Sequence, residues 1–389
     1  MFILIKNSTV YTPFSLGVVD VFIANGKIAQ IGKDLDPKGI EPLSVIDAKG
    51  KILVPGFVDG HVHLIGGGGE GGFTTRTPEV ILSDLIKAGV TTVVGLMGTD
   101  SSTRHIETLL AKTYALRMEG ISAYMFTGAY AYPSPTLTNS IKNDITFLDP
   151  VIGLKTAIAD HRAPHVSLQE LKRITMEARI GGMQSAKVGR VVVHLGGGED
   201  GFPFLEEIIK TSEIPRTQFI PTHVNRKQFM MDQAYEWMIA GGYIDLTAGI
   251  NPDLGAKGGI KVSKAIAHCI QQSLPLERFS VSSDGNGSSP RFSDNGELIG
   301  LTVSGFKCLL NELKDTHLTE KIPLDKALIP FTTAPAKMLG LDKSKGEIAV
   351  GKDADCLLLN QDLNITDVLA QGEIMMQAGT VQKYGTFER

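Results

Sequence analysis

The first feature of this chain that could do chemistry is a pair of histidines two residues apart, His61 and His63. They follow the apolar run 52–58 and precede a string of four glycines at 66–69. On a strand, residues i and i+2 point to the same face, so both imidazoles can be directed at one point. Imidazole is a preferred ligand of zinc and of other late first-row divalent metals. The pair therefore indicates a metal site, although either histidine alone could equally be an ordinary hydrogen-bonded residue.

Four further polar residues stand at or just after the ends of later apolar segments. These residues are Lys155, His194, His223 and Asp284. Each has an ordinary explanation when taken alone: a hydrogen-bonded core histidine, a lysine that extends toward solvent, or an aspartate that caps a helix. Because separate segments deliver all of them to corresponding positions, we interpret them together with the histidine pair as one metal site.

The elements that must position these side chains alternate regularly along the chain. Strands are predicted at 52–58, 92–96, 122–127, 151–155, 191–195, 218–222, 243–247 and 279–282, and helices at 78–88, 104–119, 167–178, 203–211, 228–240 and 262–273. Strands that alternate with helices indicate parallel βα units. Eight such units in about 290 residues predict an α/β fold, the (β/α)8 TIM barrel, whose active sites lie at the C-terminal ends of the strands.

The two ends of the chain have a different pattern of short alternating strands. Asn25 and Gly26 form a strong hairpin signal between two such strands. We therefore predict a small β-sandwich domain built from residues 1–54 and 343–389, with the barrel in residues 55–342.

The composition limits the classes of partner that the protein is expected to bind. The 389 residues are 42% apolar and 21% charged, with a net charge of −4, which gives no reason to expect a nucleic acid or an anionic membrane as partner. No apolar run approaches the roughly 20 residues that span a bilayer. The first residues favour a strand over a signal peptide, and three scattered cysteines give no disulfide framework. A cytoplasmic location is the expectation.

Lys155 needs a chemical explanation among metal ligands. An ammonium group with an ordinary pKa of about 10.4 would repel divalent cations and has no lone pair to offer. Reaction of its amine with CO2 gives a carbamate, an anionic bidentate ligand that can bridge two metals. We therefore predict that Lys155 is an N6-carboxylysine.

The ligand set and the layout from end to end resemble the amidohydrolase superfamily. Within it, the chain is similar to the isoaspartyl (β-aspartyl) dipeptidases over nearly its full length. The segments that carry this resemblance are 63–70 (HLIGGGGE), 74–79 (TTRTPE), 96–100 (LMGTD), 127–130 (TGAY), 160–162 (DHR), 221–226 (PTHVNR) and 282–288 (SSDGNGS). The metal set is shared with many amidohydrolases, whereas these segments are much more specific.

This resemblance implies two zinc ions per subunit and a hydroxide shared between them as the nucleophile. One zinc would be held by His61, His63 and Asp284, the other by His194 and His223, with carboxylated Lys155 bridging both. Asp284 would also take the proton from the hydroxide and pass it to the leaving amine. Tyr130 would donate a hydrogen bond to the developing oxyanion, although a packing aromatic is the alternative for this residue.

The substrate class implied is the isoaspartyl dipeptide, which carries one free α-ammonium and two α-carboxylates. Glu70 is expected to meet the ammonium, and Arg162 and Arg226 to bind carboxylates with two parallel hydrogen bonds. Thr99 and Ser288 are expected to donate hydrogen bonds to the same groups. Single charged residues are usually surface residues, but both arginines follow a predicted ligand closely in the sequence.

Two alternatives stay open at this point. One is another binuclear amidohydrolase that acts on cyclic amides, of the dihydroorotase or hydantoinase kind, and the other is a non-catalytic scaffold. The family suggests a homo-oligomer, an octamer. The glycine-rich segment 248–260 departs from the family pattern, and if it covers the pocket it bears on which leaving residue is preferred.

Overall fold

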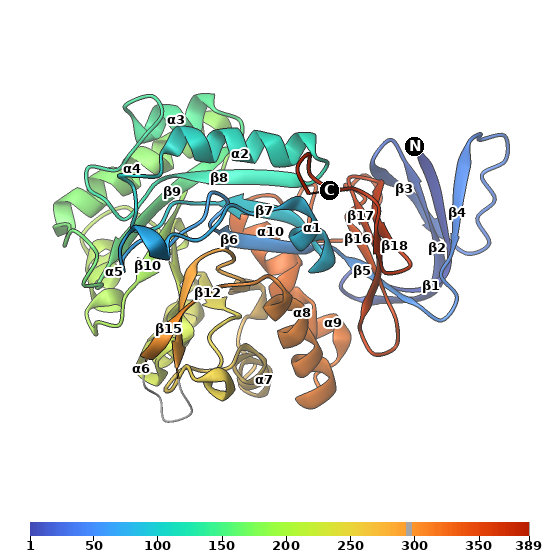
Figure 1. Ribbon diagram of the computed structural model, residues 1–389. Helices are drawn as coiled ribbons and strands as arrows, with labels where there is room; N and C mark the ends of the chain where they lie inside the picture. Colours follow the sequence, from blue (N-terminus) through green and yellow to red (C-terminus); the bar gives the residue numbers. More distant parts are fainter. Residues whose placement is uncertain (293–297, 389) are drawn as a thin grey trace.

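The computed structural model describes residues 1–292 and 298–388 (Figure 1). Strands in these ranges form an eight-stranded sheet, a nine-stranded sheet and a two-stranded hairpin. Figure 1 shows the barrel with its surrounding helices on one side of the molecule and the strands from both chain ends on the other. The predicted (β/α)8 barrel is confirmed.

The barrel strands follow one another in chain order and pair in parallel. They are β6 (Phe57–Val62), β7 (Val90–Gly95), β8 (Ser122–Gly128), β9 (Val151–Ile158), β10 (Arg190–Leu195), β11 (Phe219–Thr222), β12 (Ile244–Thr247) and β13 (Phe279–Ser282). The first and last strands meet just beyond their ends, where Val62 and Gly285 form a parallel bridge. This junction brings the histidine pair beside the segment that carries Asp284.

Helices follow most of the barrel strands. They are α1 (Leu82–Lys87), α2 (Ile106–Met118), α3 (Ile141–Phe147), α4 (Leu168–Ser185), α5 (Gly201–Lys210), α6 (Gln228–Ile239), α7 (Val262–Gln271), α8 (Lys307–Lys314), α9 (Leu324–Ala327) and α10 (Thr333–Leu339). Ser167 and Glu170 begin α4 with the expected capping box. The sequence did not predict α3, α8, α9 or α10, which have four to eight residues each. In the described ranges no helix has both the length and the apolar character needed to cross a membrane.

The apolar run 52–58, predicted as one strand, forms two. β5 (Ile52–Pro55) belongs to the nine-stranded sheet, and β6 begins the barrel after Gly56. A Cβ atom at Gly56 would lie 2.1 Å from Thr91 Oγ1, so the Thr91 side chain leaves room for glycine only. Apolarity alone predicted the run as a single strand, because both sheets bury their strands.

The two ends of the chain share the nine-stranded sheet. Its strands are β1 (Phe2–Tyr11), β2 (Ser15–Ala24), β3 (Lys27–Gly32), β4 (Leu43–Asp47), β5, β16 (Cys356–Leu359), β17 (Ile365–Ala370), β18 (Glu373–Gln377) and β19 (Thr380–Val381). The ends meet where β5 pairs antiparallel with β16. Side chains from both ends, among them Ile5, Ile23, Leu53 and Leu358, pack in one buried cluster.

The barrel interior has an apolar floor and a polar layer above it. The floor contains Val192, Ile220 and Tyr243 together with Met338 and Leu339 of α10. Two residues further along the same strands, on the same inward faces, stand His194, Thr222 and Asp245. The predicted ligand His194 and the carboxylate of Asp245 therefore lie toward the C-terminal end of the barrel.

Candidate metal centre and substrate pocket

The end of β6 and the turn after β13 bring three predicted ligands together. Atoms of His61, His63 and Asp284 that could bind a metal all lie within 4.8 Å of one another. Asp284 Oδ1 is 3.6 Å from His61 Nε2 and 3.2 Å from His63 Nε2. Asp284 has a φ of 54°, a left-handed conformation that is uncommon for residues other than glycine. The turn thus holds this carboxylate toward both histidines.

Asp59, which the sequence did not identify as part of the site, holds the Asp284 turn against β6. Its carboxylate accepts hydrogen bonds from Ser283 N (3.1 Å) and from the Ser283 hydroxyl. The same hydroxyl accepts from Gly285 N at 2.9 Å. Burial raises the pKa of Asp59 to about 7, against the lowering effect of these hydrogen bonds. The available signal was its position two residues before His61, which suggests the same face of the strand.

Lys155 lies in the middle of β9 and is completely buried. Its Nζ atom has no hydrogen-bond partner in the part of the chain that the structure describes. Burial lowers the pKa of Lys155 to about 7, against the opposing charges of Asp284 and Asp245. The amine therefore has a substantial neutral fraction near pH 7, with a lone pair available for reaction.

Unpartnered polar atoms mark the places where a metal would fit. Among the described residues, His63 Nδ1, Lys155 Nζ and Asp284 Oδ1 are buried without a hydrogen bond. Leaving a buried polar group unsatisfied costs about 1–3 kcal/mol, and more for a charged one. Lys155 Nζ and Asp284 Oδ1 fit a centre whose remaining partners are cations, whereas His63 directs Nε2, and not its unpartnered Nδ1, toward Asp284.

In two of the predicted histidine ligands, Nδ1 contacts a threonine hydroxyl, which leaves Nε2 available for a metal. His223 Nδ1 is 2.6 Å from Thr247 Oγ1, and His61 Nδ1 is 3.4 Å from Thr222 Oγ1. Thr222 in turn donates to Asp245 at 2.7 Å. Metal-binding histidines commonly use their second nitrogen in this way. Burial lowers the pKa of both histidines well below the usual range, which favours the neutral, metal-binding form.

Asp245 was also missed. Burial raises its pKa to about 6, although the hydroxyls of Ser282 and Thr222 donate to it. The signal in the sequence was a single carboxylate within the otherwise uncharged strand segment 243–247.

His194 is close to the other histidines but has no free ring nitrogen. Its ring centroid lies 4.8 Å from that of His223. Nε2 is 2.8 Å from Asp160 Oδ2, and Nδ1 contacts the Tyr130 hydroxyl. Because a carboxylate only accepts, Nε2 carries the proton and Tyr130 donates to the lone pair of Nδ1. His194 can therefore bind a metal through Nδ1 once the Tyr130 hydroxyl has left it.

Three predicted substrate-binding residues contact one another directly. Arg162 Nη1 is 3.0 Å from Glu70 Oε1, and Thr99 Oγ1 donates to the same oxygen at 3.1 Å. Arg162 also donates from Nε and Nη2 to both oxygens of Asp160, at 2.9 and 2.8 Å. Burial opposes the effect, but the hydrogen bonds from Arg162 and His194 hold the pKa of Asp160 well below its usual range. Asp160 is the third residue in this site that the sequence did not identify.

The other two predicted substrate-binding residues lie elsewhere on the rim. Arg226 ends the short helix η3 (Val224–Arg226), and its Nη1 is 3.2 Å from Leu195 O and 3.4 Å from His194 Nε2. Ser288 begins the hairpin of β14 (Ser288–Phe292) and β15 (Leu298–Val303). A Cβ atom at Gly68 would lie 3.2 Å from Ser288 Cβ, so Ser288 is packed against the glycine loop.

The glycine-rich segment 248–260 is anchored beside Arg226. Asn225 Nδ2 donates to Thr247 O at 3.1 Å and to Ile260 O at 3.0 Å, and Asn225 O accepts from Ile260 N at 2.9 Å. Both ends of the segment are therefore fixed by the residue before Arg226.

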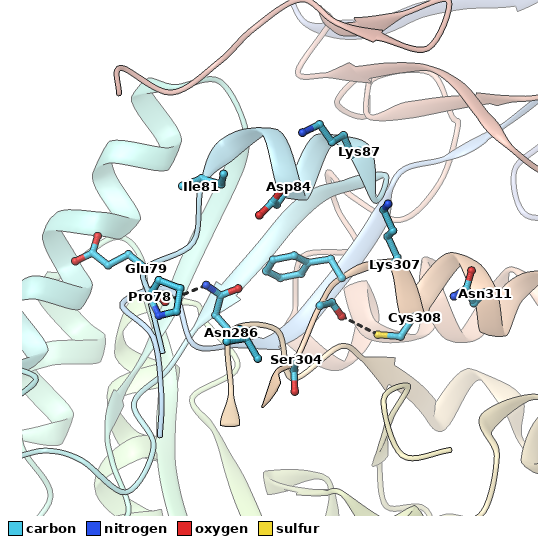
Figure 2. A pocket seen from close by; sticks show the side chains of 13 residues that line it. Pro78, Glu79, Ile81, Asp84, Lys87, Asn286, Ser304, Lys307, Cys308 and Asn311 are labelled. Carbon is cyan, nitrogen blue, oxygen red and sulfur yellow. Dashed lines mark hydrogen bonds between the residues drawn. The ribbon is translucent and has the colours of Figure 1, made fainter. Parts of the chain in front are cut away.

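A separate cavity of about 760 Å³ lies between α1 and the segment that leads into α8 (Figure 2). Its lining includes Ile81, Lys87, Phe306 and Cys308, and Asn286 reaches Pro78 O across one wall at 3.0 Å. None of the predicted site residues lines it. The cavity is therefore distinct from the metal centre, although Asn286 lies only two residues after Asp284.

Comparison with known proteins gives consistent results. The amidohydrolase family pattern matches residues 44–206, and a second amidohydrolase family pattern matches residues 259–375. A solved structure of a β-aspartyl dipeptidase from Fervidobacterium islandicum, in complex with a β-Asp-Leu dipeptide, is 40% identical, covers 98% of this chain and 99% of its own, and has a TM-score of 0.89.

More distant relatives share the fold. A D-hydantoinase from a Thermus species is 16% identical with a TM-score of 0.66, over 99% of this chain and 97% of its own. A 5'-deoxyadenosine deaminase from Methanobrevibacter smithii is 25% identical over 92% of this chain and 84% of its own.

Proposed function

The chain belongs to the amidohydrolase superfamily and, within it, to the isoaspartyl dipeptidases, and on that basis we propose that it hydrolyses the β-peptide bond of isoaspartyl dipeptides. The observation that carries the proposal is the 40% identity to a β-aspartyl dipeptidase over nearly the whole of both chains. The arrangement of side chains at the rim of the barrel supports it independently, because a centre for metals adjoins a network of opposite charges.

The residues present fit a pair of zinc ions. His61, His63 and Asp284 would hold one ion and His194 and His223 the other, with carboxylated Lys155 between them. The unpartnered Nζ of Lys155 supports the modification, because a buried neutral amine can react with CO2 and the carbamate then gains partners. Bound zinc would polarise the scissile carbonyl and lower the pKa of an attacking water.

Two residues would transfer protons and stabilise the negative charge that develops on the substrate. Asp284 Oδ1, which has no hydrogen-bond partner among the described residues, would accept the proton of the attacking water and return it to the leaving amine nitrogen. Tyr130 would turn its hydroxyl from His194 Nδ1 to the developing oxyanion. Burial raises the pKa of Tyr130 well above its usual range, so the hydroxyl stays protonated as a donor.

Recognition of the substrate would exchange one set of ion pairs for another. The substrate ammonium would meet Glu70, and its carboxylates would meet Arg162 and Arg226, with Thr99 and Ser288 as further donors. In the structure Glu70 and Arg162 contact each other at 3.0 Å, so a zwitterionic ligand that enters between them can satisfy both charges. A homo-oligomer, an octamer by family resemblance, stays a prediction that light scattering would check.

A substrate panel tests the proposal. The purified protein, with its zinc content measured, is assayed on β-Asp-Leu, α-Asp-Leu, dihydroorotate and hydantoin. In the β isomer the aspartyl residue keeps its ammonium and α-carboxylate, and the scissile carbonyl is on the side chain. In the α isomer the same anchors would carry the scissile carbonyl away from the metals.

We expect kcat/KM on β-Asp-Leu to exceed that on α-Asp-Leu by at least about a thousandfold, roughly 4 kcal/mol. The cyclic amides should be turned over slowly or not at all. Comparable rates on the two Asp-Leu isomers, or a preference for a cyclic amide, would contradict the proposal.

A further inference from the structure

Asp160, on the loop after β9, contacts both halves of the proposed machinery with one carboxylate. Its Oδ2 accepts from His194 Nε2 at 2.8 Å and from Arg162 Nη2 at 2.8 Å. Its Oδ1 accepts from the Arg162 backbone N and from Nε, both at 2.9 Å. Asp160 is 6% exposed, so these contacts are shielded from solvent. Among the described residues, Asp160 therefore links a predicted metal ligand to a predicted substrate-binding residue.

Toward His194, the contact determines which nitrogen can bind a metal. A carboxylate accepts hydrogen bonds only, so it fixes the proton on Nε2 and leaves the lone pair on Nδ1. Nδ1 is the nitrogen that contacts the Tyr130 hydroxyl, on the edge of the ring away from Asp160. Without a carboxylate at this position, the imidazole would be free to place its proton on either nitrogen.

Toward Arg162, the contact determines the plane of the guanidinium group. Nε and Nη2 are both used by Asp160, which leaves Nη1 to reach Glu70 at 3.0 Å. A guanidinium held by two parallel hydrogen bonds loses little further freedom when its remaining nitrogen binds a ligand. The same carboxylate thus presents one nitrogen of Arg162 toward the predicted ammonium-binding residue.

We propose that Asp160 is a positioning residue that sets the metal-binding tautomer of His194 and the orientation of Arg162 at the same time. This inference rests on the proposed function for its substrate half, whereas its metal half requires no activity. It predicts that one substitution changes two properties, metal affinity and substrate KM, through two different residues.

The test is Asp160→Asn in the full-length protein, alone and combined with Arg162→Ala. Asp160→Asn should weaken zinc binding by about 10- to 100-fold, measured by competition with a chelator. It should also raise KM for β-Asp-Leu about tenfold or more, because the charged hydrogen bonds that orient Arg162 are weakened.

The double variant separates the effect of Asp160 on zinc, through His194, from its effect on the substrate, through Arg162. When Arg162 is already alanine, Asp160→Asn should change KM by less than about twofold, because the route to the substrate is gone. The zinc affinity should still fall by the full amount, because that route passes through His194. A residue that merely stabilised the loop would lower zinc affinity and raise KM by the same amounts in both backgrounds.

Glu206→Gln is the matched control, because Glu206 also binds an arginine, Arg216, through both oxygens but lies on α5 away from the site. It should leave zinc affinity and KM unchanged. If Asp160→Asn does not fold by circular dichroism, Asp160→Glu replaces it, since this variant keeps the charge and moves the carboxylate by one methylene.

Unchanged zinc affinity in the variant would overturn the role toward His194. An equal rise of KM in both backgrounds would overturn the role toward Arg162. If the unmodified protein cleaves no isoaspartyl dipeptide, the proposed function fails, and the positioning role then depends on the zinc measurement alone.

Discussion

The two halves of the pocket satisfy their polar groups in opposite ways. The open half consists of His61, His63, Lys155 and Asp284, and three of these residues have a buried polar atom with no hydrogen bond among the described residues. The paired half consists of Glu70, Asp160, Arg162, His194 and Tyr130, and contacts between these residues connect all five. Burial alone does not explain the difference, because Asp160, His194 and Tyr130 in the paired half are as buried as the histidines of the open half.

The difference indicates what each half requires from outside the chain. An unpaired buried donor or acceptor is costly, so the open half is incomplete as a purely protein structure. In the paired half, Arg162 already forms ion pairs with Glu70 and Asp160. A zwitterionic ligand that enters would only replace the contact between Arg162 and Glu70. We therefore expect substitutions in the open half to act on metal content and turnover. Substitutions of Glu70 or Arg162 in the paired half should act on substrate recognition with the metals retained. Asp160 and His194 join the two halves, so their substitution should affect both properties.

The largest effect is expected for Lys155→Ala. Loss of the proposed bridging ligand should leave the protein with little zinc and lower kcat/KM by at least about a thousandfold, because metals contribute several kcal/mol of transition-state stabilisation. Short-chain carboxylic acids should restore part of the zinc content and part of kcat/KM. The measurements are zinc content by atomic emission and the rate on β-Asp-Leu.

A matched control for Lys155 is Lys345→Ala, since Lys345 is also buried but is paired with Asp353 and Asp355 at 2.8 Å. This variant should lose thermal stability and keep its zinc. Intact-mass data that show an unmodified Lys155 in the active, metal-loaded protein would contradict the carbamate.

Asp284→Asn should have the next largest effect. An amide cannot take up the proton of the attacking water, so kcat should fall by about 10²–10⁴ while KM changes little. Zinc must be quantified in the same samples, because Asp284 is also a predicted ligand. Near-normal turnover with both metals bound would show that another group carries the proton.

The barrel could be predicted from the sequence because its signals are local. Most strands are short apolar runs followed by a helix with its own start and stop signals, such as Ser167 with Glu170 at the start of α4. The break at Gly56 could not be predicted in this way. It depends on the approach of Thr91 from the neighbouring strand, a contact between residues 35 positions apart.

In the site, residues with unusual chemistry for their position were identified and their supporting residues were not. Histidines and a lysine at the ends of apolar segments are unusual enough to be identified as candidates. Asp59, Asp160 and Asp245 are ordinary residue types, and their roles depend on partners from other segments, such as His194 for Asp160. Asp59 meets Ser283, 224 residues away. The state of His194 was equally hidden, because its two nitrogens are occupied by residues from two other loops.

Glu70→Gln should have a smaller effect that is confined to the paired half. Loss of the charge that meets the substrate ammonium should lower kcat/KM on β-Asp-Leu by about 10- to 100-fold, the value of a charged hydrogen bond. Discrimination against α-Asp-Leu should narrow by a similar factor. Zinc content should not change, because Glu70 contacts only Thr99 and Arg162 in the hydrogen bonds of the structure.

Glu79→Gln is the control for Glu70, because Glu79 lies nine residues away and pairs with Lys112 at 3.5 Å beside the separate cavity. It should leave kcat/KM on β-Asp-Leu and on α-Asp-Leu unchanged. Loss of zinc from Glu70→Gln would remove the distinction between the two halves.

The smallest effect concerns the stability of the open half without its metals. In zinc-free and CO2-free protein, Lys155→Met should raise the free energy of unfolding near pH 7 by about 1–3 kcal/mol, because methionine fills a similar volume and leaves no buried donor unpaired.

This gain in stability should also depend on pH. Burial lowers the pKa of Lys155 from 10.5 to about 7, so between these values the unfolded chain binds more protons than the folded one and the stability of the unmodified protein rises with pH. The advantage of the methionine variant should therefore be greatest at and below pH 7 and should diminish toward pH 10, as followed by thermal unfolding of both proteins. A methionine variant that is less stable at pH 7 would mean that Lys155 has partners within the protein itself, and the open half would then not require a metal.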